Sequence, residues 1–281
     1  MFWVPSVVWL PARLGTRGAG HYRSGVGSSD SIDRKQGADN LSGGFGNDTL
    51  YGFGGGDQLN GGLGFDDMYG GSGNDVMVGL NGFDTLYGGS GYDNLKGNAG
   101  INTLFGGNGN DIPNGGQGAD NLLEGDGDDV ISASFGFDTL FGGIGDDELN
   151  GTVGNEFLNG GSGDDLLRGG TGADTFEFLA VDGHDTIRDF GNNVDTIQLD
   201  ASLVEDFAAL RLLANVVNGN LVITFYPDTS LTLNNVENLN ALLDDVTYLD
   251  LIQVEAKQRS LICCRFRGRQ LKASSLSPRV A

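Results

Sequence analysis

The sequence contains very few of the residues on which several common protein classes depend. Its 281 residues include two cysteines, two histidines and five prolines. Because Cys263 and Cys264 are adjacent, a disulfide scaffold is excluded, and two histidines provide neither an HExxH zinc-protease motif nor a clear catalytic triad. The scarcity of proline excludes collagen-like and proline-rich linker sequences. No apolar run approaches the ~20 residues of a membrane-spanning helix, so we expect no membrane span.

Basic residues are also scarce, with 16 lysines and arginines against 38 aspartates and glutamates, for a net charge of −22. A chain with this charge repels nucleic-acid phosphates and anionic membrane surfaces, so we expect no nucleic-acid partner. The negative charge is concentrated in residues 34–177, which hold 23 acidic and 4 basic side chains. Residues 252–281 carry a net positive charge instead, which separates this tail from the acidic body.

Glycine is abundant, with 50 residues, and most of it follows a nine-residue period. With Gly43 as position 1, sixteen consecutive nonads cover residues 34–177 without insertion or deletion. Position 4 is glycine in all sixteen, position 6 is aspartate in fourteen, and position 8 is aliphatic, methionine or phenylalanine in fifteen. A weaker copy lies at 25–33, with Asp30 and Ile32 in register. Disordered low-complexity sequence has no reason to keep this phase, which favours a repeat architecture.

Each nonad has the composition of a tight turn followed by a short strand. Glycine at positions 1, 2 and 4 permits positive φ angles and a close approach of the backbone. The apolar residue at position 8 alternates with outward neighbours, which predicts a strand at positions 7–9 with one inward side chain. Position 6 places a carboxylate beside the turn.

Position 9 shows a second period. On alternate nonads it is mostly large and apolar, and on the intervening nonads it is mostly small or polar. The first set is Tyr51, Tyr69, Tyr87, Phe105, Leu123, Phe141 and Asn159. Nonads two apart therefore have equivalent surroundings, which predicts an all-β flat coil with two strands and two turns in each 18-residue lap. Strands of successive laps are expected to stack in parallel, about 4.8 Å apart.

The position-6 aspartates would form columns of like charge in such a coil, so a cation is expected between them. Carboxylate and carbonyl oxygens are hard ligands that favour calcium, whereas magnesium demands tight octahedral geometry and keeps its waters. One leucine-sized side chain per nonad contributes about 1.5–3 kcal/mol, which does not offset the entropy of ordering nine residues. We therefore expect several calcium ions to bind and to drive folding.

The nonad G-G-x-G-x-D-x-U-x resembles the RTX, or haemolysin-type calcium-binding, repeat over residues 34–177. The resemblance implies a right-handed parallel β-roll of 18-residue coils, with calcium between each turn and the turn two nonads later. It also implies that turn carbonyls and position-6 carboxylates are the ligands. On one edge the implied carboxylates are Asp39, Asp57, Asp75, Asp93, Asp111, Asp129, Asp147 and Asp165. On the other edge they are Asp48, Asp66, Asp84, Asp120, Asp138 and Asp174.

Three residues depart from this pattern. Asn102 and Glu156 occupy position 6 of the second column, and we expect weaker calcium binding there. Pro113 occupies position 8 and cannot donate a hydrogen bond to the sheet, so we expect an irregular roll near residues 106–123.

Residues 178–251 contain less glycine and several alternating apolar segments, which predict strands, while residues 201–214 favour a helix. The segments 172–176, 184–190 and 194–197 resemble the C-terminal cap of serralysin-like secreted proteins. This resemblance implies a small, mostly-β cap that closes the coil, and export through type I secretion machinery.

The two ends of the chain are expected to be flexible. Residues 1–33 should be poorly ordered, and their apolar start lacks the preceding basic residues of a Sec signal peptide. The basic tail 252–281 is expected to be disordered.

The expected function is calcium binding by a secreted, extracellular protein that has no catalytic domain. It would remain unfolded at low cytosolic calcium and fold outside the cell. One alternative is the C-terminal module of a secreted protease, lipase or alginate epimerase, although the sequence contains no GxSxG or HExxH motif. Another is a surface adhesin whose position-9 aromatic residues bind a glycan or protein partner. Those residues could instead stack across strands and support the roll.

Overall fold

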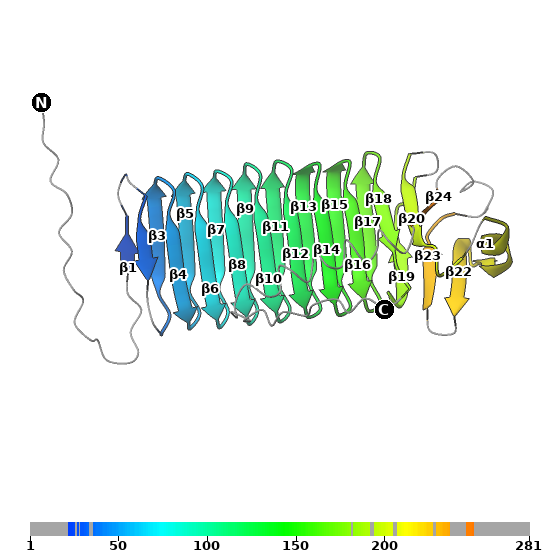
Figure 1. Cartoon of the computed structure of the whole chain (residues 1–281), viewed down its shortest axis with the longest axis horizontal. Coiled ribbons are helices and arrows are strands. Elements are labelled where there is room, and N and C mark those ends of the chain that lie inside the picture. Colours follow the sequence, from blue (N-terminus) through cyan, green and yellow to red (C-terminus); the bar gives the residue numbers. More distant parts are fainter. Residues whose placement is uncertain are drawn as a thin grey trace, which may run out of the picture.

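The computed structural model describes residues 22–25, 27, 29–33, 36–180, 182–191, 194–204, 207–226, 229–236 and 246–249. Over these residues the chain forms a parallel β-solenoid, whose strands lie side by side along the long axis (Figure 1). Each lap contributes one strand to each of two sheets. The apolar start of the chain and the basic tail 252–281 lie outside the described residues.

Within the described chain, the first sheet has 13 strands. In spatial order they are β1 (Tyr22–Ser24), β3 (Asn40–Phe45), β5 (Gln58–Leu63), β7 (Val76–Asn81), β9 (Asn94–Ala99), β11 (Ile112–Gln117), β13 (Val130–Gly136), β15 (Glu148–Gly154), β17 (Leu166–Thr171), β19 (His184–Ile187), β23 (Thr229–Leu233), β22 (Asn220–Tyr226) and β21 (Ala214–Val217).

The second sheet has 11 strands in the same part of the chain. In spatial order they are β2 (Ser31–Asp33), β4 (Thr49–Gly54), β6 (Asp67–Ser72), β8 (Thr85–Ser90), β10 (Thr103–Asn108), β12 (Asn121–Asp126), β14 (Thr139–Ile144), β16 (Phe157–Ser162), β18 (Thr175–Phe178), β20 (Thr196–Asp200) and β24 (Val246–Leu249).

The pairing register confirms the predicted 18-residue lap. Leu50 of β4 is opposite Met68 of β6, and Leu59 of β5 is opposite Met77 of β7, each 18 residues further along the chain. Equivalent positions of alternate nonads therefore stack directly on one another in parallel strands. This stacking brings all residues of one repeat position into a single row.

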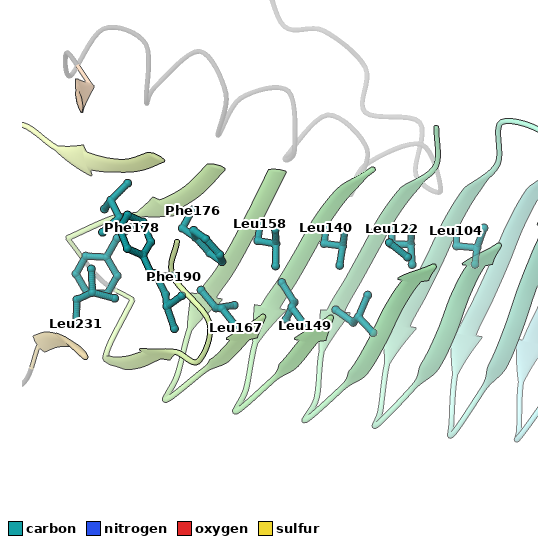
Figure 2. Packing of buried hydrophobic residues seen from close by; sticks show 14 of the residues in the cluster. Leu104, Leu122, Leu140, Leu149, Leu158, Leu167, Phe176, Phe178, Phe190 and Leu231 are labelled. Carbon is teal, nitrogen blue, oxygen red and sulfur yellow. The ribbon is translucent and has the colours of Figure 1, made fainter. Parts of the chain in front are cut away.

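The position-8 side chains fill the space between the two sheets. Leu104, Leu122, Leu140 and Leu158 form one row from the even-numbered strands, and leucines of the odd-numbered strands face them (Figure 2). These four side chains are fully buried, and each contributes about 1.5–3 kcal/mol through removal of apolar surface from water. The roll thus has a narrow, continuous apolar core.

Pro113 disturbs the sheet on one side only. It lies in β11 and pairs with Leu95 of β9, as the repeat predicts. On the other side, the β11–β13 pairing begins only at Asn114 opposite Ser132, whereas β9–β11 begins at Ile112. Proline has no N–H to donate, so the expected irregularity is confined to the start of the β11–β13 pair.

Positions 2 and 4 of the nonad both have positive φ, but only position 4 requires glycine throughout. The φ values at position 4 range from 113° to 157°, and a Cβ on Gly64 would overlap the carbonyl oxygen of Gly46 on the preceding lap. Position 2 also accommodates Phe53 (φ 71°) and Leu80 (φ 79°), in the left-handed region that other residues reach at a modest cost. The backbone thus explains why position 4 has no exceptions.

The stacking extends beyond the sixteen nonads at both ends. β1 and β2 lie within the segment 1–33 and pair with β3 and β4, so strand stacking begins before residue 34. Ile32 of the weak copy at 25–33 is buried in the core, as its register predicts.

Beyond the last nonad, β19 and β20 continue the two sheets in parallel. The antiparallel strands β21, β22 and β23 then follow at the far end, next to the helix α1 (Phe207–Leu213) (Figure 1). This helix is shorter than the 201–214 segment predicted, because residues 201–203 form a turn and Ala214 begins strand β21. Within the described residues, no helix is long and apolar enough to cross a membrane.

Candidate calcium sites

The roll places each position-6 residue at the end of a turn, one residue before a strand. Asp57 precedes β5 and Asp66 precedes β6, on opposite edges of the roll. The fourteen aspartates that the sequence singles out are 1–6% exposed. They form two columns along the roll, as predicted, and every member is directed away from water.

In thirteen of the fourteen aspartates, from Asp48 to Asp174, one carboxylate oxygen accepts a hydrogen bond from the preceding lap. The backbone N–H of Asp57 donates to Asp75 Oδ1 at 2.7 Å, and the N–H of Asp75 donates to Asp93 Oδ1 at 2.7 Å. The same bond recurs on the other edge, where Asp48 N–H donates to Asp66 Oδ1 at 2.8 Å. These bonds fix the side-chain rotamer and leave the second oxygen pointing elsewhere.

That second oxygen has no hydrogen-bond partner and is inaccessible to water. A buried carboxylate oxygen without a partner is costly, and so many in register require an explanation. The unpartnered Oδ2 atoms belong to Asp48, Asp57, Asp66, Asp75, Asp84, Asp93, Asp111, Asp120, Asp129, Asp138, Asp147, Asp165 and Asp174.

Turn carbonyls approach the same space as these free oxygens. A Cβ built on Gly88 would lie 2.6 Å from Asp93 Oδ2 and 2.7 Å from the carbonyl oxygen of Gly106, one lap further on. Glycine at position 1 therefore lets oxygens from two laps approach the backbone, where a Cβ would collide with them. A group of carboxylate and carbonyl oxygens of this kind suits a hard cation.

Burial raises the pKa of these carboxyl groups when no cation is bound. The pKa of Asp120 rises to about 6, that of Asp111 to about 7 and that of Asp147 to about 8. Loss of hydration is the largest cause in all three. The backbone hydrogen bond to each carboxylate lowers the pKa in part, and neighbouring aspartates raise it again. A divalent ion would remove this conflict by compensating the buried charges.

The donor set fits calcium. In the described part of the chain, no group of three or more His, Cys, Asp or Glu side chains could hold a metal ion by itself. Backbone carbonyls lie beside these carboxylates, and calcium accepts six to eight oxygen ligands in flexible geometry. Across most of the roll, the residues that would hold the ion are the position-6 aspartates together with the turn glycines.

The two departures in the second column alter the site in different ways. Asn102 Oδ1 accepts the N–H of Asp84 at 3.1 Å, so its amide nitrogen is left facing the space beside Gly97. An N–H₂ group cannot ligate calcium. Glu156 has one more methylene than aspartate, both of its oxygens lack partners, and burial is the main cause that raises its pKa to about 9.

Besides Asp30, whose N–H donates to Asp48 Oδ1 at 2.7 Å, three further carboxylates join these columns outside the predicted set. Asp165 N–H donates to Asp185 Oδ1 at 3.1 Å, and Asp174 N–H donates to Asp195 Oδ1 at 3.0 Å. The sequence signal was the Asp-Thr-Ile that begins at each, which matches the Asp-Thr-Leu of the nonads. The third is Glu124, at position 1, which is 2% exposed.

Burial raises the pKa of Glu124 well above its usual value. The nearby charges of Asp129, Asp111 and Asp147 raise it further. In the sequence, Glu124 is marked only by the fact that it stands at position 1, where most nonads have glycine.

The position-9 aromatic residues form a stacked row on one sheet. Tyr51, Tyr69, Tyr87 and Phe105 have ring centroids 4.7–4.8 Å apart and nearly parallel planes. A second short stack joins Phe65 and Phe83 at 4.9 Å. Of the two readings of this row, the structure supports cross-strand stacking directly.

The fold and these two rows of buried carboxylates define a class of protein: a parallel β-solenoid whose turns offer oxygen ligands. The family model described as an RTX calcium-binding nonapeptide repeat (four copies) matches residues 35–68, 69–93, 88–122, 125–155 and 150–187. These matches cover more than half of the sequence. The chain belongs to this family, and its repeats are calcium-binding repeats rather than a catalytic domain.

Two solved structures are similar to this chain at low sequence identity. The extracellular lipase LipA from Serratia marcescens is 23% identical with a TM-score of 0.38, and the match covers 68% of this chain and 39% of the lipase. The AlgE6R3 subunit of the Azotobacter vinelandii mannuronan C5-epimerase is 22% identical with a TM-score of 0.34, over 55% of this chain and 91% of the subunit. No curated protein matches the sequence.

Proposed function

We propose that the chain is a secreted protein that binds a row of calcium ions along each edge of the roll and folds as they bind. The observation that carries this proposal is the set of buried Oδ2 atoms without partners, repeated lap after lap beside turn carbonyls. The ligands would be the fourteen position-6 aspartates, with Asn102 and Glu156 marking weaker sites.

Folding and metal binding are coupled because the empty sites oppose the fold. Two columns of desolvated carboxylates raise the free energy of the metal-free roll, and calcium reverses this effect. A site with a dissociation constant near 0.1 mM, in about 1 mM calcium, stabilises the fold by roughly 1.4 kcal/mol. A dozen such sites would decide whether the roll forms, so the chain would remain unfolded in the cytosol and fold after export.

Circular dichroism during a calcium titration of the full chain tests this proposal. We expect little strand signal in chelator, a cooperative rise in strand signal as calcium is added, and a much weaker response to magnesium at the same concentration. A sodium chloride titration to matched ionic strength controls for screening of the negative charge. A complete strand signal in chelator would show that folding does not depend on the metal.

A further inference from the structure

Glu124 breaks the repeat at a place where the repeat has a structural reason to hold glycine. It occupies position 1 of the nonad 124–132, and thirteen of the sixteen nonads have glycine at this position. The residue lies in β12, just before the turn that ends at Asp129. Its side chain is 2% exposed, and neither Oε1 nor Oε2 has a hydrogen-bond partner. A buried carboxylate with two free oxygens needs a positively charged partner or a proton.

The Glu124 carboxylate is directed into the first aspartate column. Next to Gly88, the free Asp93 Oδ2 is accompanied by the carbonyl oxygen of Gly106. A Cβ built on Gly106 would collide with both Asp111 Oδ2 and Glu124 Oε2. These two carboxylate oxygens therefore lie close together beside Gly106, an arrangement that the preceding lap does not show at Gly88.

The same pair of laps has the weakest strand pairing in this part of the sheet. The β9–β11 pair begins at Ile112 opposite Asn94, but the β11–β13 pair begins only at Asn114, after Pro113. The turns joined by this incomplete pair are those that end at Asp111 and Asp129. Val130 N–H still donates to the Asp111 carbonyl oxygen at 3.0 Å, but Pro113 has no N–H to donate. An additional link between these two laps would therefore act beside this missing bond.

We propose that Glu124 is an additional calcium ligand in the site between the turns ending at Asp111 and Asp129. This inference rests on the proposed calcium-binding function and names one residue that the regular repeat does not supply. Asp111 and Glu124 bring two negative charges to one space, and backbone carbonyls complete the shell. Because calcium affinity rises with ligand charge, this ion is the most tightly held in the first column.

The test compares Glu124→Gln, which keeps the shape and removes the charge, with Glu124→Gly, which restores the regular repeat. Glu148→Gln is the matched control, because Glu148 is an exposed acidic residue at the start of β15. Each full-length protein is loaded with calcium and dialysed against chelator buffers of graded free calcium. Bound calcium per chain is measured by elemental analysis, and circular dichroism reports whether the roll remains folded.

We expect the unaltered chain and Glu148→Gln to retain one ion at free calcium concentrations that remove the others. Both Glu124 variants should release that ion at roughly tenfold or more higher free calcium, as loss of one charged ligand implies. Identical release curves for all four proteins would overturn the assignment. Tighter retention of calcium by Glu124→Gly would also overturn the assignment, because it would mean that the glutamate side chain occupies the place of a calcium ion.

The two levels of the proposal fail in different ways. If no protein in the series bound calcium, the proposed function itself would be wrong. If all four bound calcium and folded alike, with the same release curves, only the role of Glu124 would be lost. Should Glu124→Gln fold poorly, Glu124→Gly still tests the inference, because glycine at position 1 is the residue of the neighbouring laps.

Discussion

The two edges of the roll have the same turn geometry but differ in the completeness of their carboxylate columns. The first edge has aspartate at position 6 in every nonad from Asp39 to Asp165, and it gains Glu124 at one lap. The second edge is interrupted by Asn102 and Glu156. At Asn102 the connecting hydrogen bond is kept, whereas both Glu156 oxygens lack partners. The comparison at Asn102 therefore separates the effect of charge from the effect of the fold.

Removal of one charge from the complete column should have the largest effect. Asp93 lies between Asp75 and Asp111, so Asp93→Asn weakens two intact sites, each worth roughly 1.4 kcal/mol at tenfold excess calcium. We expect a loss of about 3 kcal/mol in the calcium-dependent free energy of unfolding. Asp84→Asn lies next to Asn102, where one site is already impaired, and should cost about half as much. Urea denaturation at fixed calcium measures both.

The control for this comparison is repetition of the measurement at very low calcium. There, both variants should be no less stable than the unaltered chain, because each removes a buried charge without removing the hydrogen bond from the preceding lap. Equal losses for the two variants in calcium would contradict the difference between the edges.

The dependence on pH follows from the raised pKa values. A carboxyl group whose pKa is near 3.9 in the unfolded chain and about 6 to 8 in the metal-free roll keeps its proton on folding between these values. The metal-free roll is therefore most stable at low pH and loses stability as pH rises through this range. Calcium must displace these protons, so its affinity rises with pH.

We expect the apparent calcium affinity to increase at least tenfold between pH 5 and pH 8. Calorimetry in two buffers of different ionisation enthalpy should detect proton release on binding at pH 6. Because Asp147 retains its proton to about pH 8, its lap should be among the last to fill. An affinity that stays flat between pH 5 and pH 8 would contradict the buried, metal-free carboxylates described above.

Repair of the second edge should have a smaller and opposite effect. Asn102→Asp restores a carboxylate where an amide nitrogen now faces the space beside Gly97. We expect stability in calcium to rise by about 1–2 kcal/mol, since two neighbouring sites regain a charged ligand. Stability in chelator should fall, because an additional buried charge is left uncompensated. Thermal unfolding in calcium and in chelator would show this change of sign.

A conservative change elsewhere serves as the reference for that repair. Asn108→Asp adds the same charge at the exposed end of β10 and should alter stability by little in either buffer. If Asn102→Asp behaved like this reference, the second edge would not bind calcium at residue 102.

Much of the fold follows from the sequence because one physical rule repeats. The alternation of Tyr51, Tyr69 and Tyr87 with polar residues gives the 18-residue lap, and the lap gives the register and the core. The glycine at position 4 is required by its φ and by contact with the preceding lap. Charge columns follow from the same stacking, so the position-6 residues could be assigned to two edges before the structure was known.

The features that the sequence did not reveal lie beyond the strict nine-residue period or at Glu124, which occupies a position where glycine is explained by the backbone alone. Asp185 and Asp195 continue the columns at separations of 20 and 21 residues, because short insertions lengthen the last laps. A role for Glu124 was not predicted, because close approach of the backbone already accounts for glycine at position 1. The structure shows that its long side chain reaches the neighbouring turn. β1 was not predicted because residues 16–24 have no glycine at positions 1, 2 and 4, whereas the weak copy at 25–33 did place Ile32 of β2 in register.

A substitution in the aromatic row should have the smallest effect on stability. It extends the comparison from the two edges of the roll to the surfaces of its sheets. Tyr69 stacks on both Tyr51 and Tyr87 at 4.8 Å, so Tyr69→Ala should cost about 0.5–1.5 kcal/mol of stability per stacked pair lost. Tyr92 is 61% exposed and provides the control. Because the row lies on the sheet surface rather than in the turns, calcium stoichiometry should remain unchanged in both variants. A Tyr69→Ala protein as stable as the unaltered chain would remove stacking as the reason for this row and leave recognition of a glycan or protein partner as its explanation.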